Sequence, residues 1–442
     1  MLSLYRKGDW FCASGEALMT PSKDPSRLVA ETQTYSLPGD STLLIRPTTT
    51  NDILAVSFVL PMGSREEPEE LAGLTTLGLR MLTRGTRNRS DFDIAVALES
   101  LGASFSTDVQ KDRTTLTIQT TGSRWKETFR IIRELLTESI FPEEAFEIEK
   151  EILIKEIRED LDSPFTAASR LFQGTFFHGH PYSHPGQGSE ETVQKLTLEQ
   201  AKSSILDRLG GVPVSIGAVG AIEPEVMLES MVDLVSALPN THPVQLNTPR
   251  KLAPRTCQVE VCEQRSTEAE CMIYGFPAPH LHEPNYAVWR VLDSIVGGSM
   301  DSRLFQEVRE KQGLVYQIGS SYPPMEWQGC FSISLMSTRQ NHQKVLDSLD
   351  REIQRLKSET PDADEVDRAR TYLKGTFLMS QERCSDQAFL LARYHSLGLG
   401  IEFIDKYPVL LDEVTPEDIR ANADAYLNHP VLAIVGPGNG AS

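Results

Sequence analysis

The chain has 442 residues, of which 40% are hydrophobic and 24% charged, a composition that excludes a disordered chain. This length exceeds what one hydrophobic core usually serves, so we expect two or three domains. Asp and Glu outnumber Lys and Arg by 62 to 43, and the net charge of −19 argues against nucleic acid and anionic membranes as partners, because both would be repelled.

In chain order, two halves of the sequence predict the same succession of elements. Each begins with a strand, continues with two helices, two strands and two long amphipathic helices, and closes with a strand. The first half predicts these elements over 53–63, 72–82, 90–103, 104–109, 114–121, 121–138, 142–161 and 212–220. The second half predicts them over 269–279, 285–296, 302–314, 315–322, 330–337, 342–358, 362–380 and 431–437.

This repeat predicts an α+β fold of two homologous units, each an antiparallel sheet faced by helices. We expect an N-terminal extension over 1–35, a first unit over 36–237 and a second over 257–442. The stretch between them, 238–256, is rich in Pro and Asn and is typical of a linker.

The six cysteines indicate the compartment. Their spacing includes no C-x-x-C pair, which favours a reducing environment over a disulfide framework. No apolar run reaches the 18 residues of a membrane span, and the first residues lack the apolar centre of a signal peptide. We expect a cytoplasmic protein with no membrane partner, an organellar stroma being the alternative. The cysteines are Cys12, Cys257, Cys262, Cys271, Cys330 and Cys384.

Four stretches resemble motifs of the pitrilysin/insulinase-type metallopeptidases, also called inverzincins. They read GSREEPEELAGL, FEIEKEILIKEI, GHPYSHPGQGSEETVQKLT and GGSMDSRLFQEVREKQGLVY, and the likeness extends over about residues 36–438. In that family two homologous halves close around a peptide like a clamp. The resemblance therefore implies that this chain forms half of a clamshell chamber.

The zinc motif of that family is degenerate here. Active members carry H-x-x-E-H on a helix, with two His as zinc ligands and the Glu as general base. The resemblance places Thr76 at the first His, Leu79 at the Glu and Arg80 at the second His. Threonine is a poor zinc ligand, leucine cannot accept a proton, and arginine is a permanent cation. We therefore expect this chain to bind no metal and to have no peptidase activity alone.

Two acidic positions of the family motif remain. The resemblance places Glu149 at a supporting Glu and Glu156 at the third zinc ligand, and seven residues on a helix put them on nearly the same face. We hypothesise that Arg80 pairs with Glu156, so that a guanidinium takes the charge position of the metal. The alternative is that this helix merely presents a solvated acidic face.

The second-half motif is intact. The resemblance implies that Arg309 and Tyr316 grip the substrate backbone and stabilise the oxyanion, which requires a fixed cation and a phenolic donor. The alternative is an ion pair of Arg309 with Glu307 or Glu310, and a core position for Tyr316. The loop at 297–299, Gly-Gly-Ser, either lets a peptide backbone pass closely or makes a packing turn.

Other candidate sites are weaker. Two groups of histidines lack a carboxylate at a defined spacing: His178, His180 and His184, and His280 and His282. Both groups lie in loops flanked by Pro, which are usually surface turns. We expect structural roles for them. The cysteines lie in no nucleophile signature, and GAVGAIEPE lacks a phosphate-binding pattern, so cysteine-peptidase and nucleotide-binding functions are disfavoured.

Family members of this length occur as pairs, so the resemblance implies a non-catalytic subunit of a heterodimeric zinc metalloendopeptidase. Its partners would be an H-x-x-E-H homologue, which would bind the zinc, and unfolded or extended peptides. Two alternatives stay open: a non-proteolytic scaffold subunit, and a homodimeric peptide-binding protein whose acidic chamber takes basic peptides.

Overall fold

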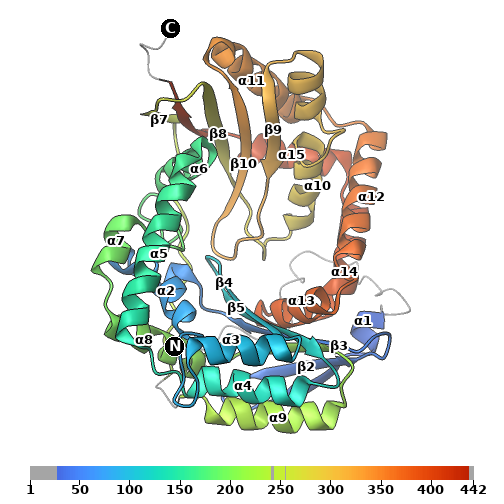
Figure 1. Cartoon of the computed structure of the whole chain (residues 1–442). Helices are drawn as coiled ribbons and strands as arrows, with labels where there is room; N and C mark the ends of the chain where they lie inside the picture. The colour runs from blue at the N-terminus through green and yellow to red at the C-terminus, as the bar shows by residue number, and fades with distance from the viewer. Residues whose placement is uncertain (1–26, 240–242, 254, 438–442) are drawn as a thin grey trace.

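The repeat predicted from the sequence is present as two β-sheets with one strand order (Figure 1). The computed structural model describes residues 27–239, 243–253 and 255–437. The six-stranded sheet has the order β1-β2-β6-β3-β5-β4, and the five-stranded sheet has the order β7-β11-β8-β10-β9. The strands are β1 (Gln33–Ser36), β2 (Thr42–Pro47), β3 (Ile53–Leu60), β4 (Ser104–Val109), β5 (Thr114–Thr121), β6 (Ser215–Gly220), β7 (Val259–Gln264), β8 (Ala269–Ala278), β9 (Val315–Ser321), β10 (Gly329–Thr338) and β11 (Val431–Gly436).

The helices confirm the predicted long elements to within a few residues. They are α1 (Arg27–Ala30), α2 (Leu74–Met81), α3 (Asp91–Ser100), α4 (Trp125–Thr137), α5 (Glu143–Asp162), α6 (Pro164–Phe176), α7 (Glu190–Lys195), α8 (Leu198–Gly211), α9 (Pro224–Ala237), α10 (Tyr286–Val296), α11 (His342–Ser358), α12 (Ala363–Met379), α13 (Cys384–Ser396), α14 (Phe403–Glu413) and α15 (Pro416–Tyr426). The predicted helix over 302–314 is a π-helical turn, Phe305–Lys311. Neither α6 nor α13 was predicted from the sequence.

The described strands of each sheet pair antiparallel, as predicted, except at one place. Strand β6 lies parallel to β2, and β11 lies parallel to β7. Both exceptions are the closing strand of a unit, which returns to its sheet through helices and so arrives in the direction of an earlier strand. The same exception in both sheets supports the two-unit repeat. Strand β1, within the predicted extension, adds an edge to the first sheet, and residues 1–26 of that extension lie outside the described residues.

Both faces of the central strands are buried, which explains their continuous apolar sequences. In β11, Leu432 and Ile434 belong to the core under the second unit's own helices. The alternating residues Val431, Ala433 and Val435 belong to a separate core on the opposite face. Because side chains alternate across a strand, a run such as VLAIVG must therefore be apolar at every position.

The second face of each sheet is covered by a helix from the other half of the sequence. Helix α6, from the first half, packs on β8 and β11 through Phe172 and its neighbours. Helix α13, from the second half, packs on β3 and β6 through Ala388 and Leu391. Figure 1 shows α13 lying on the first sheet and α6 rising beside β8. The two units therefore exchange one helix each.

The exchanged helices lie so close that two strand positions admit only glycine. A Cβ added at Gly275 would lie 2.2 Å from the ring of Phe172 on α6. A Cβ added at Gly217 would lie 2.0 Å from the carbonyl oxygen of Ala388 on α13. Each helix therefore rests against strand backbone, and any side chain at these glycines would push it away.

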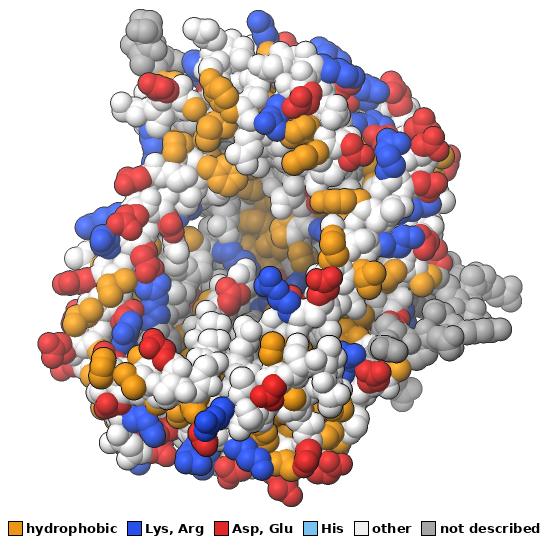
Figure 2. All heavy atoms as spheres, turned by 45° about the vertical axis from the view of Figure 1, so that its right-hand side comes forward, with side chains coloured by type: hydrophobic (Ala, Val, Ile, Leu, Met, Phe, Trp, Pro, Cys, Tyr) orange, Lys and Arg blue, Asp and Glu red, His pale blue; other side chains and the backbone are white. Residues whose placement is uncertain are grey.

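The two units enclose an open space. Figure 2 shows a hollow between them with hydrophobic side chains at its floor, which agrees with half of a clamshell. Within the described residues, no helix combines the length and the apolar character needed to cross a lipid bilayer.

We predict that Gly275→Ala destabilises the protein by about 1–3 kcal/mol, because overpacking forces Phe172 and α6 to shift. Denaturant unfolding measures the change. Gly174→Ala, on α6 itself, is the matched control, since a Cβ there meets nothing within 4 Å and alanine favours the helix. Equal stability of Gly275→Ala and the wild type would contradict the close packing of α6.

Candidate functional site

Helix α2 carries the three positions of the degenerate zinc motif, and its N-terminus is capped by a buried carboxylate. Glu67 accepts hydrogen bonds from the backbone N–H groups of Gly73, at 3.0 Å, and Thr75, at 2.6 Å. A negative charge here stabilises the N-terminal end of the helix dipole. Burial raises the pKa of Glu67, and Arg208, whose Nη2 lies 3.9 Å from the carboxylate, opposes that shift.

The three motif positions have separate environments. Leu79 is buried in the core of the first unit, 3% exposed, so the position of the general base now contributes packing. Thr76 donates a hydrogen bond of 3.0 Å to the carbonyl of Gly186 and so joins α2 to the loop before α7. Arg80 reaches α5. None of the three side chains can activate water.

The hypothesised ion pair between Arg80 and Glu156 is confirmed, and it has two parallel hydrogen bonds. Arg80 Nη1 lies 3.2 Å from Glu156 Oε1, and Nη2 lies 2.5 Å from Oε2. Arg80 Nη1 also lies 3.7 Å from buried Glu149, whose second oxygen pairs with Arg84. Two guanidinium groups thus balance two carboxylates. The acidic positions are engaged, so the alternative of a merely solvated acidic face is wrong for Glu149 and Glu156.

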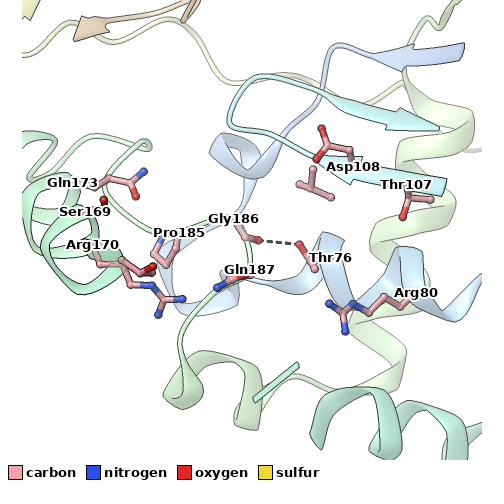
Figure 3. Close-up of a pocket in the computed structure, with 12 residues that line it drawn as sticks. Thr76, Arg80, Thr107, Asp108, Ser169, Arg170, Gln173, Pro185, Gly186 and Gln187 are labelled. Atoms are coloured by element: carbon pink, nitrogen blue, oxygen red, sulfur yellow. Dashed lines mark hydrogen bonds between the residues drawn. The ribbon is translucent and has the colours of Figure 1, made fainter. Parts of the chain in front are cut away.

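A cavity of about 460 Å³ lies beside this cluster (Figure 3). Three elements form it: α2, the edge strand β4 and helix α6, with the loop at 185–187 between them. The lining residues are Thr76, Arg80, Thr107, Asp108, Val109, Thr166, Ser169, Arg170, Gln173, Pro185, Gly186 and Gln187. The position that would hold a catalytic metal in an active relative therefore opens onto a polar pocket next to a free sheet edge.

The hairpin turn after β4 is tied to the second unit by a buried ionic network. Arg65 pairs with Asp112 in that turn and with Glu326 at 3.0 Å, and its guanidinium lies 4.4 Å above the Trp327 ring. Tyr182 donates a hydrogen bond to Asp112. Burial disfavours the charge on Arg65, but Glu326 and Asp112 outweigh it and raise its pKa. The pocket is therefore held in a fixed relation to the second sheet.

Two of the candidate histidines, His180 and His184, have structural contacts, and they lie inside the protein rather than in a surface turn. His180 is 4% exposed and its Nε2 lies 3.0 Å from the carbonyl oxygen of Arg250. His184 Nε2 lies 3.2 Å from the carbonyl oxygen of Ser64. Across the part of the chain that the structure describes, no three His, Cys, Asp or Glu side chains are grouped so as to hold a metal ion.

Arg309 and Tyr316 lie apart from the pocket, on the second unit. Arg309 lies on the π-helical turn with its guanidinium 4.6 Å above the Phe305 ring, and Glu307 pairs instead with Lys311. Among the described residues, no carboxylate lies within ion-pair distance of Arg309. Tyr316, on the edge strand β9, is 63% exposed. The alternatives of an ion-paired arginine and a core tyrosine are therefore wrong.

The nearby glycine loop packs as a turn. Its Gly297 accepts a hydrogen bond of 3.2 Å from the backbone N–H of Ser320 on β9. Of the two interpretations of this loop, the structure favours the packing turn.

Family comparisons agree with this geometry. Residues 42–185 match the model described as insulinase (peptidase family M16), and residues 195–373 match the model described as the peptidase M16 inactive domain. Together they cover well over half of the chain. The chain belongs to the insulinase (M16) peptidase family.

Relatives resemble this M16 chain over most of their length. An uncharacterised zinc protease of Streptomyces coelicolor is 27% identical over 385 residues, which cover 85% of this chain and 83% of the relative. One from Rickettsia felis is 24% identical over 389 residues, covering 87% and 93%. The crystal structure of a peptidase M16 inactive domain from Pseudomonas fluorescens has a TM-score of 0.84 at 21% identity, covering 93% of this chain and 99% of that one. A protease structure from Helicobacter pylori has a TM-score of 0.82 at 17% identity, covering 92% and 99%.

Zinc, the metal of the M16 family, does not fit the residues of this site. A zinc ion needs neutral or anionic ligands, whereas Arg80 directs a permanent cation at the carboxylates that would help to bind it. Sequence reasoning missed Arg84, which completes the charge balance, and Arg170 in the pocket. Arg84 lies three residues past the end of α2, so no helical spacing in the sequence could have indicated its contact with Glu149.

We predict that Thr76→His combined with Arg80→His restores zinc binding, because the new imidazoles and Glu156 would supply three ligands. Elemental analysis after gel filtration should give about one zinc per chain, against none for the wild type. Adding Glu156→Gln should remove it. A correctly folded double variant that binds no more zinc than the wild type would show that α2 and α5 are not in ligand register.

We predict a pH-dependent stability contribution from Lys111, whose Nζ donates to the carbonyl of His184. Burial lowers the pKa of Lys111 to about 8, from 10.5. Between these values the unfolded chain retains a proton that the folded chain has lost, so stability rises with pH. The difference in unfolding free energy between the wild type and Lys111→Met should therefore move in favour of the wild type from pH 7 to pH 10. Lys202→Met, at an exposed position, is the control, and equal behaviour of both variants would contradict the burial effect.

Proposed function

We propose that this chain is the non-catalytic subunit of a zinc metalloendopeptidase and pairs with an M16 homologue that carries H-x-x-E-H. The observation that carries the proposal is the contrast between its two motif sites. At the zinc position, Arg80 and Glu156 form an ion pair with each other. Arg309 and Tyr316 are exposed, and no described carboxylate neutralises Arg309.

In this proposal the partner supplies the zinc, the water and the general base. The chain described here binds substrate and stabilises charge. Arg309 would place a fixed cation, and Tyr316 a phenolic donor, toward the substrate carbonyl as it gains negative charge. Both lie at the edge of the second unit, where a side chain can reach a neighbouring subunit.

Substrate would be held as an extended strand. Strand β4 is an edge strand, and its outer backbone groups can pair with a peptide by β-augmentation. Thr107, Asp108 and Val109 of this strand also line the pocket. A peptide on β4 would therefore pass directly across the pocket mouth.

We predict that the protein is inactive alone on a quenched fluorogenic peptide and active when mixed with an H-x-x-E-H homologue from the same organism. Arg309→Ala in the mixture should lower kcat by roughly 100-fold or more, the range for losing one oxyanion donor. Arg351→Ala, an exposed arginine on α11, is the matched control and should leave the rate unchanged.

Two results would contradict the subunit proposal. A homologue fully active by itself and indifferent to this chain would favour the scaffold role. Peptide binding by this chain alone as a homodimer, with no activity in any mixture, would favour a peptide-holding protein.

A further inference from the structure

Helix α6 has two faces with different tasks. Ala167, Ala168, Phe172 and Phe176 are buried against the second sheet. The residues at the complementary helical spacing face the pocket instead: Thr166, Ser169, Arg170 and Gln173. The docking of α6 on the other unit therefore fixes where these polar groups lie, and Figure 3 shows Arg170 reaching from α6 toward the 185–187 loop.

Arg170 is a cation without a partner in this pocket. Among the described residues, no carboxylate lies within ion-pair distance of it, and its buried Nη2 has no hydrogen-bond acceptor. The nearest acidic influence, Asp160, accepts a hydrogen bond from Gln187 at 2.9 Å. The guanidinium charge is therefore left to attract an anionic ligand in the pocket, and a hydrogen bond between two charged groups is stronger than one between neutral groups.

The pocket holds two other charged side chains. Arg80 is neutralised by Glu156, whereas Asp108 keeps its negative charge, because the Gln110 amide that donates to it is neutral. Figure 3 shows Asp108 on β4, apart from Arg170 on α6, so the side of the pocket formed by α6 presents a positive charge. The net charge of −19 would by itself favour basic peptides, but charges beyond about 8 Å are largely screened at physiological ionic strength.

We propose that this pocket binds a carboxylate of the extended peptide held along β4, with Arg170 as its charged donor. The inference rests on the proposed function and names its substrate class: peptides with a free C-terminus or an Asp or Glu side chain at the pocket. Guanidinium and carboxylate groups match in a two-pronged arrangement, and Ser169 and Thr166 supply hydroxyl donors on the same helix face. The anion site would thus lie beside the degenerate zinc motif, not on it.

The test measures binding of fluorescein-labelled peptides of about ten Gly, Ser, Thr and Val residues to the full chain by fluorescence anisotropy. One pair of peptides ends in a free acid or an amide, and the other carries an internal Asp or Asn. The acid of a pair should bind roughly ten-fold more tightly or better, the scale of a charge-assisted hydrogen bond. The pair that shows the preference tells whether the carboxylate is terminal or belongs to a side chain.

Arg170→Gln should abolish the preference, and Arg170→Glu should reverse it in favour of a matching Lys peptide. Arg351→Gln removes an equal charge from an exposed site on α11 and should preserve it. Equal binding of acid and neutral peptides, or a preference that survives Arg170→Gln, overturns the inference and leaves the proposed function standing. If no peptide binds, alone or with the H-x-x-E-H homologue, both proposals fail.

Discussion

The exchange of α6 and α13 between the two units is the constraint on which the rest of the structure depends. Each helix covers the second face of a sheet whose strands are apolar on both sides, and neither sheet could leave that face in water. The contact at Gly275 sets how closely α6 approaches, and the opposite face of α6 then forms one wall of the pocket. The packing of α6 on the second sheet thus positions the polar side chains of α6 beside α2. The Arg65 network also fixes the pocket relative to the second unit, because it joins the turn after β4 to that unit.

The zinc position illustrates how a metal site can be replaced without loss of the fold. Glu149 is buried, and a buried carboxylate without a counter-charge would be strongly destabilising. Two arginines on α2 and just after it provide that counter-charge, and Leu79 fills the space of the general base with packing. The charges in this part of the molecule are therefore balanced, because both carboxylates, Glu149 and Glu156, form ion pairs with Arg80 or Arg84.

The two motif sites differ in what they offer to a ligand. The first unit offers a free strand edge, a polar pocket and an unpaired guanidinium. The second unit offers Arg309 and Tyr316 on an exposed surface, outside that pocket. A division of labour with a second chain accounts for both features: this chain would hold peptide on its own edge and contribute charge across an interface. The carboxylate preference proposed for the pocket would then specify which peptides this chain holds.

The sequence by itself determined the two-unit repeat and the long helices and strands, because these depend on local periodicity. The degenerate zinc motif was recognised through the resemblance of this sequence to the metallopeptidase family. That resemblance also indicated the pair between Arg80 and Glu156. The sequence did not predict α6 or α13, the single parallel pair in each sheet, or the part played by Arg84 and Arg170. These features arise from contacts between segments far apart in the chain. Whether an arginine is neutralised depends on which carboxylates the fold brings within a few ångströms, so only the tertiary structure decided that Arg80 is paired and Arg170 is not.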